Sequence, residues 1–239
     1  MQFVLKIPKF GSMNNKINEI RYKKIKYFLI DGIAGAGKTS FAYYLKKKLK
    51  KKNIIIFNKD IFLKNRNERI SFTKKNQNKK IKMQNIIHYD LKKYNKILMA
   101  FKNKENKTIT FKNLYNRKNG KNNLSYKFNF NINNIYIIEG LYVCSDFNFL
   151  NKKKTVSILI ISDHYRCLIE KIRRIRDKKI SIYLVIKEYL NIHLYSFLHY
   201  LNNIKFNFIL NADKYLRKSN KRILSHQVEL IKIFLDKHK

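Results

Sequence analysis

A glycine-rich segment between two regularly patterned stretches constrains the fold more than any other feature. Residues 32–39 read GIAGAGKT and fit the pattern G-x-x-x-x-G-K-[ST]. The apolar run KYFLID precedes them at 26–31, and apolar residues at helical spacing follow from Thr39. Glycines let the backbone turn tightly, so that successive N–H groups and the helix N-terminus can face phosphate oxygens. The sequence therefore predicts a strand, a phosphate-binding loop and a helix, in that order.

The residues of this loop have separate expected roles. Lys38 would reach the β- and γ-phosphates of a nucleotide, and the Thr39 hydroxyl would be a ligand of Mg²⁺. A chance glycine-rich turn is the alternative, and the two flanking elements argue against it. We therefore expect ATP and Mg²⁺ as cofactors. The residues expected to contact the nucleotide are Gly32, Ala34, Gly35, Ala36, Gly37, Lys38, Thr39 and Ser40.

The rest of the pattern predicts an α/β fold with a mostly parallel sheet flanked by helices. A second apolar run at 53–57 completes a βαβ unit. Polar, lysine-rich residues at 64–84 are typical of a loop. Further core strands are predicted at 135–140, 155–162 and 207–210, and helices at 86–101, 164–177, 182–200 and 222–236.

One segment departs from the alternation of strands and helices. Residues 108–111 and 124–130 alternate in period two around a turn that contains Asn119 and Gly120. This predicts a β-hairpin insertion over about 107–131. We expect a single domain over residues 26–239, preceded by an N-terminal extension over 1–25.

Two acids lie where a parallel sheet binds its ligands. Asp60 follows the second predicted strand and Glu139 ends the third, and ligands bind at the carboxyl ends of such strands. Both would then face Thr39. We expect Asp60 to accept the proton of an attacking hydroxyl, and Asp60, Glu139 and Thr39 to hold the metal. An ordinary loop acid at Asp60 and a turn cap at Glu139 are the alternatives.

The charge of the chain is extreme but evenly spread. Lys and Arg number 54 against 15 acids, which gives a net charge of +39. Such a balance points to nucleic acid or an anionic membrane surface. The lysines are scattered through every segment, however, among abundant Asn, Ile, Tyr and Phe, as AT-rich codons would give. A nucleic-acid partner therefore stays open but is not favoured.

Cysteine usage and hydropathy bear on the expected cellular location of the protein. Its two cysteines are too few for a disulfide framework. No run approaches the ~18 uninterrupted apolar residues of a membrane helix. A cytoplasmic location is expected, and the basic N-terminus leaves organelle import open.

Five stretches in chain order resemble the uridine kinase and phosphoribulokinase family of P-loop kinases, over about Phe28 to Leu210. They read IDGIAGAGKTS, NKDIF, YNKILMAFKNKENKTITFKNLYN, YIIEGLYV and IEKIRRIRD. The resemblance implies a P-loop NTPase fold and a kinase that transfers the γ-phosphoryl of ATP to a hydroxyl of a small metabolite. It implies that Asp60 is the base and Glu139 a metal-shell group. It also implies that Arg173 and Arg176 belong to a lid helix over the phosphates, and it allows a homo-oligomer.

The acceptor is where the chain departs from the uridine kinase pattern. That pattern has Tyr-Asp-Phe and then a base-contacting His-x-Arg, whereas residues 115–120 here read YNRKNG. A uridine- or cytidine-like nucleoside is the first expectation and a sugar phosphate the second. Asp90 and Tyr115 are candidate acceptor contacts, with a helix-start acid and a core aromatic as the alternatives. A nucleic-acid-stimulated NTPase and a degenerate nucleotide binder also stay open.

Overall fold

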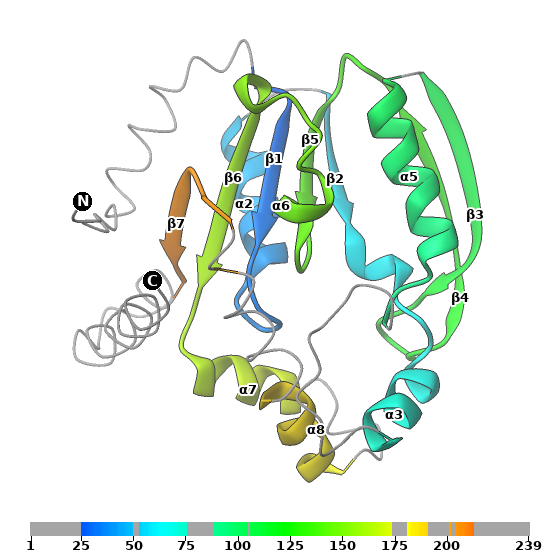
Figure 1. Ribbon diagram of the computed structural model, residues 1–239, viewed down its shortest axis with the longest axis vertical. Coiled ribbons are helices and arrows are strands. Elements are labelled where there is room, and N and C mark those ends of the chain that lie inside the picture. Colours follow the sequence, from blue (N-terminus) through cyan, green and yellow to red (C-terminus); the bar gives the residue numbers. More distant parts are fainter. Residues whose placement is uncertain are drawn as a thin grey trace.

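A five-stranded parallel sheet forms the centre of the molecule (Figure 1). The computed structural model describes residues 25–49, 53–75, 88–104, 106–173, 181–190, 201 and 204–212. The strand order is β2-β5-β1-β6-β7, and every neighbouring pair is parallel, as predicted. The strands are β1 (Tyr27–Asp31), β2 (Ile54–Asn58), β5 (Ile135–Glu139), β6 (Thr155–Ile161) and β7 (Phe208–Asn211).

The central strand β1 shows why the sheet is covered on both sides. All five of its residues are buried, and alternate side chains point to opposite faces. Phe28 and Ile30 belong to one core cluster, together with Phe41 and Leu45 of α2 (Lys38–Leu49). Tyr27 and Leu29 belong to a second, aromatic cluster on the opposite face, which includes residues of α5 (Leu91–Asn103).

The predicted hairpin is present and lies beside β2. Strands β3 (Lys107–Tyr115) and β4 (Asn122–Phe130) pair antiparallel. Aromatic contacts attach them to the segment after β2, a 3₁₀ turn η1 (Lys59–Phe62). The rings of Phe62 and Phe111 pack edge to face, with 5.3 Å between their centroids. The rings of Phe57, in β2, and Phe128 pack in the same way, with 5.6 Å between centroids. The hairpin is therefore fixed against the turn that carries Asp60.

One element corrects the sequence-based expectation. The predicted loop at 64–84 contains the helix α3 (Arg66–Lys75), while 76–84 lie outside the described residues. The Asn65 side chain accepts the backbone N–H of Glu68 at 2.9 Å, which is a helix N-cap. The backbone N–H of Arg66 donates to the Gly120 carbonyl at 3.0 Å. A cap and a tertiary contact thus outweigh the polar composition.

The remaining predicted helices up to residue 200 are present in the described residues, while 174–177 and 191–200 lie outside them. Helix α5 begins at Leu91 rather than 86, because Asp90 caps it. Among the described residues, the helices α7 (His164–Arg173) and α8 (Ile182–Glu188) follow β6. The short α6 (Val143–Asp146) and η2 (Lys152–Lys154) follow β5. Most of the predicted N-terminal extension and the predicted helix at 222–236 lie outside the described residues. None of the helices described has the length and apolar character that a bilayer crossing requires.

Candidate functional site

The glycine-rich loop turns at the carboxyl end of β1 and leads directly into α2. Gly32, Gly35 and Gly37 have φ of 148°, 92° and 91°, which side-chain-bearing residues rarely adopt. A Cβ at Gly35 would lie 2.7 Å from the Cys167 carbonyl oxygen in α7. The loop is therefore packed tightly against α7, and its shape depends on glycine.

The two side chains expected to act in this loop make defined contacts. The Lys38 Nζ donates to the carbonyl oxygens of Gly32 at 2.6 Å and Ile33 at 2.9 Å, so it folds back over the loop. The Thr39 hydroxyl donates to Glu139 Oε1 at 2.8 Å. The structure thus brings together Thr39 and Glu139, which are 100 residues apart in the sequence. Ala36 is buried, whereas the Ser40 side chain is exposed on the first turn of α2.

Glu139 occupies an electrostatically unfavourable position. The residue is 1% exposed, and burial raises the pKa of its carboxyl. The charge of Asp60 raises this pKa further, while Lys38 and the Thr39 hydrogen bond oppose the shift. Two neighbouring carboxylates, one of them buried, make a place where a cation would be stabilised.

The oxygen donors at this place fit Mg²⁺. This ion prefers oxygen ligands, keeps several waters, and is usually held by one or two carboxylates together with substrate phosphates. Thr39, Asp60 and Glu139 supply one hydroxyl and two carboxylates of that kind. Within the described residues, no group of three or more His, Cys, Asp and Glu could hold a metal alone. The site therefore suits a metal that arrives with a nucleotide.

Asp60 lies on η1, directly after β2. Its backbone N–H donates to Asn58 Oδ1 at 2.7 Å, and its carboxylate accepts the Tyr89 hydroxyl at 3.4 Å. Arg117 Nη2, in the hairpin turn, is 3.8 Å from Asp60 Oδ2. The carboxylate stays half exposed, which an acceptor hydroxyl would require. The sequence pointed to the turn at 115–120 only as a departure from the uridine kinase pattern and gave no sign that Arg117 pairs with Asp60.

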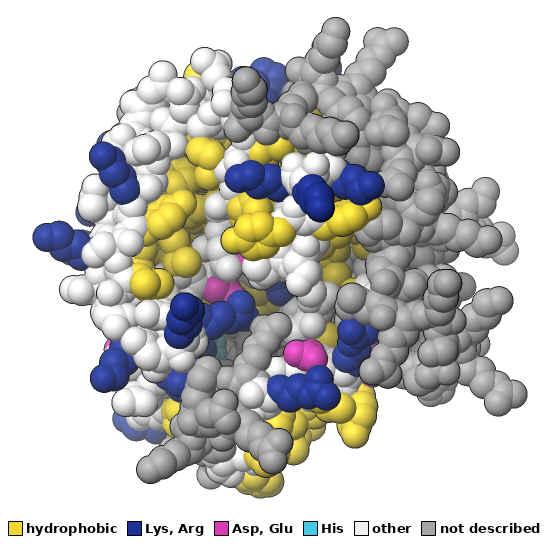
Figure 2. Space-filling model, turned by 180° about the vertical axis from the view of Figure 1, so that it is seen from behind, with side chains coloured by type: hydrophobic (Ala, Val, Ile, Leu, Met, Phe, Trp, Pro, Cys, Tyr) yellow, Lys and Arg dark blue, Asp and Glu magenta, His cyan; other side chains and the backbone are white. Residues whose placement is uncertain are grey.

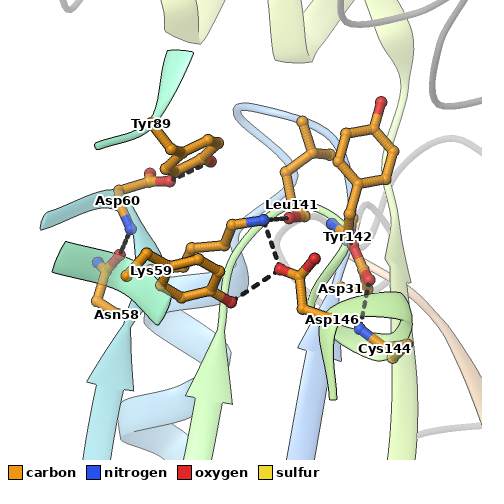
Figure 3. Close-up of polar contacts among 11 residues, drawn as sticks. Asp31, Asn58, Lys59, Asp60, Tyr89, Leu141, Tyr142, Cys144 and Asp146 are labelled. Atoms are coloured by element: carbon orange, nitrogen blue, oxygen red, sulfur yellow. Dashed lines mark hydrogen bonds and ion pairs between the residues drawn. The ribbon is translucent and has the colours of Figure 1, made fainter. Parts of the chain in front are cut away.

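A buried ion pair beside Asp60 was not predicted (Figure 3). Lys59 is fully buried, and its Nζ lies 2.6 Å from Asp146 Oδ2 and 2.8 Å from the Leu141 carbonyl oxygen. The Tyr94 hydroxyl donates to the same Asp146 oxygen at 2.8 Å. Nothing in the sequence distinguishes Lys59 from the rest of the 54 basic residues. Asp146 could have drawn notice as one of only 15 acids.

Asp31, the last residue of β1, is a second buried acid that sequence reasoning missed. Its carboxylate accepts the backbone N–H groups of Gly32 and Tyr142 at 2.9 Å and of Cys144 at 3.2 Å. Tyr142 and Cys144, which lie beside Asp31 in Figure 3, follow Glu139 along the chain. Asp31 therefore ties the start of the phosphate loop to the segment after Glu139, in a buried polar network that is hydrogen-bonded.

The two candidate acceptor contacts have clear structural surroundings. Asp90 caps α5 by accepting the Lys93 N–H at 3.2 Å, and its carboxylate pairs with the Lys93 ammonium at 3.0 Å. Tyr115 is buried, and the Arg69 guanidinium lies 4.8 Å from the centre of its ring. These surroundings match the helix-start acid and the core aromatic. A contact of either residue with the acceptor stays a prediction.

The arginines expected in a lid lie at the edge of the described chain. Arg173 ends α7, is largely exposed, and pairs with Glu170 on the same helix at 3.1 Å. Arg176 lies outside the described residues. The lid therefore also stays a prediction.

Comparison with known proteins bears on the fold. No family model and no curated protein sequence matches the chain. Among solved structures, a protein of Silicibacter sp. TM1040 assigned as a fructose transport system kinase is 13% identical, with a TM-score of 0.55 over 85% of this chain and 98% of that one. A protein of Bacillus stearothermophilus assigned as a uridine kinase is 12% identical, with a TM-score of 0.53 over 84% and 96%. The chain therefore has the α/β fold of these two structures.

Proposed function

We propose that this protein is an ATP-dependent kinase that phosphorylates a hydroxyl group of a small molecule. The observation that carries the proposal is the 2.8 Å contact between Thr39 and Glu139 at the end of a glycine-rich phosphate loop. Asp60 lies close enough to Glu139 for its charge to raise the pKa of Glu139. These contacts support a phosphate cradle, a magnesium site and a candidate base at one edge of the sheet.

The reaction that suits these groups is an in-line phosphoryl transfer. The acceptor hydroxyl oxygen attacks the γ-phosphorus, the bond to the β–γ bridging oxygen breaks, and ADP leaves. The hydroxyl proton passes to the Asp60 carboxylate. Lys38 exchanges its loop carbonyls for β- and γ-phosphate oxygens. When bound, Mg²⁺ neutralises phosphate charge, and Arg173 and Arg176 would add cations from a closing lid.

A uridine- or cytidine-like nucleoside is the first acceptor to test. One of the two fold relatives is assigned as a uridine kinase. The half-exposed Asp60 carboxylate beside the hairpin could receive a ribose hydroxyl. Against a nucleoside, the Arg69 guanidinium lies over the Tyr115 ring and would compete with a base for stacking there.

A sugar phosphate is the second candidate, and three guanidinium groups on α3 and in the hairpin turn favour it. Arg117 pairs with Asp60, and Arg69 lies over Tyr115. Arg66 packs against Gly120, where an added Cβ would lie 2.3 Å from its Cζ. Guanidinium groups bind phosphate in a two-pronged geometry that lysine cannot match. Their gathering on α3 and the hairpin turn suits an anionic acceptor.

The test is ADP release from Mg-ATP by the purified protein across an acceptor panel. The panel holds uridine, cytidine, ribulose 5-phosphate, pantothenate, glycerate and nucleoside monophosphates, with RNA as a non-acceptor. Lys38→Ala gives the background rate. Stimulation by one small acceptor, lost in Lys38→Ala, is the expected result. Stimulation by RNA alone, or by nothing, would contradict the proposal.

Asp60→Asn tests the assignment of the base. The amide keeps the size and the hydrogen bond of the carboxylate but cannot accept the proton. We expect kcat to fall at least ~10²-fold, because a positioned base contributes that much. Full turnover by Asp60→Asn would remove Asp60 from this role.

A further inference from the structure

Lys59 is a buried cation that the proposed reaction does not use. Its side chain is 0% exposed, and the residue directly precedes Asp60. Removing an ammonium from water costs free energy, and an ion pair only partly offsets that cost. A methionine would fill the same space without a charge. The buried charge therefore calls for a function other than packing.

The Lys59 ammonium joins the two strand ends that carry the proposed site. Asn58 ends β2 and pairs in register with Glu139 at the end of β5. Lys59 follows Asn58, and its Nζ contacts the Leu141 carbonyl and the Asp146 carboxylate, which follow Glu139. A Cβ at Gly140 would lie 2.7 Å from Lys59 Cβ, so glycine there leaves room for the lysine stem.

Two tyrosines connect this ion pair with the carboxylates around it (Figure 3). The Lys59 Nζ lies 4.5 Å from the centre of the Tyr89 ring and 5.2 Å from that of Tyr94. The Tyr89 hydroxyl donates to Asp60, and the Tyr94 hydroxyl donates to Asp146. A cation over a tyrosine ring is favourable when both are shielded from water. The path from Asp146 to Asp60 thus runs through Lys59 and Tyr89.

We propose that Lys59, held by Asp146, is a positioning residue that fixes Asp60 relative to Glu139. Lys59 does not contact the substrate. It holds η1, the 3₁₀ turn that contains Asp60, against the segment that follows Glu139. The acceptor hydroxyl at Asp60 and the metal at Glu139 would then keep one relative position. This matters because a small displacement of the base strongly reduces turnover. This inference rests on the proposed kinase function for its consequence in turnover, but not for its structural content.

The experiment compares the single variant Lys59→Met with the double variant Lys59→Met/Asp146→Asn. The single variant leaves a buried carboxylate without its cation, so its Tm should fall. The double variant removes both charges and should recover most of that loss. Amide hydrogen exchange at residues 60–63 should still rise about tenfold in the double variant, with exchange in β1 unchanged. Its kcat should fall about tenfold, with KM for Mg-ATP within about twofold of wild type.

Lys26→Met is the matched control. The Lys26 Nζ also donates to a backbone carbonyl, that of Ile132 at 2.8 Å, but at the opposite end of the sheet. This variant should keep wild-type exchange at 60–63 and wild-type kcat. If the double variant does not fold, Tyr89→Phe replaces it, because it removes only the hydroxyl that reaches Asp60. It should raise exchange at 60–63 without lowering Tm.

The exchange measurement separates this inference from the proposed function. If the wild-type protein phosphorylates no acceptor, the proposed function fails, and exchange at 60–63 still decides whether Lys59 positions the turn. Wild-type exchange at 60–63 in a folded double variant would overturn the inference. Wild-type kcat in an active, folded double variant would overturn it as well.

Discussion

At the scale of single residues, Glu139 couples the stability of the protein to its proposed chemistry. Burial raises the pKa of this carboxyl above its ordinary value of 4.5, and the Asp60 charge adds to the shift. Between the ordinary and the raised pKa, the folded chain binds a proton that the unfolded chain releases. The free energy of unfolding therefore falls as pH rises through this interval, and the loss persists above it.

Glu139→Gln should therefore stabilise the nucleotide-free protein at neutral pH. The amide keeps an oxygen for the Thr39 hydroxyl and carries no charge. We expect Tm at pH 7 to rise by roughly 2–4 °C, as about 1 kcal/mol gives in a chain of this length. The difference from wild type should vanish below the ordinary pKa, where both side chains are neutral. Thermal melts between pH 4 and 8 measure it.

The same variant should lose function while it gains stability. Without the carboxylate, Mg-ATP should raise Tm less than it does in wild type, since stabilisation by a ligand grows with the logarithm of its affinity. Glu170→Gln on α7 is the control, because it removes an acid whose pairing with Arg173 is solvent-exposed. A destabilised Glu139→Gln at pH 7 would show that the Glu139 charge is fully compensated by its surroundings.

At the scale of elements, variants of Asp90, a candidate acceptor contact, test whether this residue stabilises α5 as its N-cap. Asp90→Ala removes the acceptor of the Lys93 N–H and should cost about 1 kcal/mol, the usual value of an N-cap. Asp90→Asn keeps a capping oxygen and should stay near wild type. Urea unfolding of both variants measures the difference. Equal stability of the two variants would contradict the capping role.

The elements also show how far sequence patterns reach. Short apolar runs predicted all five sheet strands, period-two alternation predicted the hairpin, and helical spacing predicted α2, because each pattern reflects how that element buries its side chains. Helix α3 was not predicted, because its sequence is polar and lacks a clear apolar stripe. The Asn65 cap and the contact with Gly120, far away in the sequence, stabilise it instead. In the site, the motif placed Thr39, and strand ends placed Asp60 and Glu139. The Lys59–Asp146 pair depends on a contact across 87 residues, which spacing in one sequence cannot reveal.

At the scale of the whole molecule, the net charge and the proposed reaction depend on different sets of residues. The net charge of +39 gives a strong field that attracts any polyanion. Figure 2 shows Lys and Arg side chains spread over the visible face, with a few beside the acidic side chains near its middle. A spread of this kind predicts binding to nucleic acid without sequence preference. The chemistry, in contrast, depends on a few groups at one edge of the sheet.

Salt should therefore separate the two properties. Binding to random-sequence RNA should weaken steeply between 50 and 200 mM salt, by about 10³-fold or more if ~6 phosphates are contacted, because bound counterions are released. Acceptor-stimulated ADP release should change far less over the same range, since Glu139 is buried and salt screens buried charges much less than exposed ones. Filter binding and coupled turnover assays on one preparation measure both. RNA-stimulated ADP release that persists at 200 mM salt would instead mean that nucleic acid contacts the phosphate loop itself.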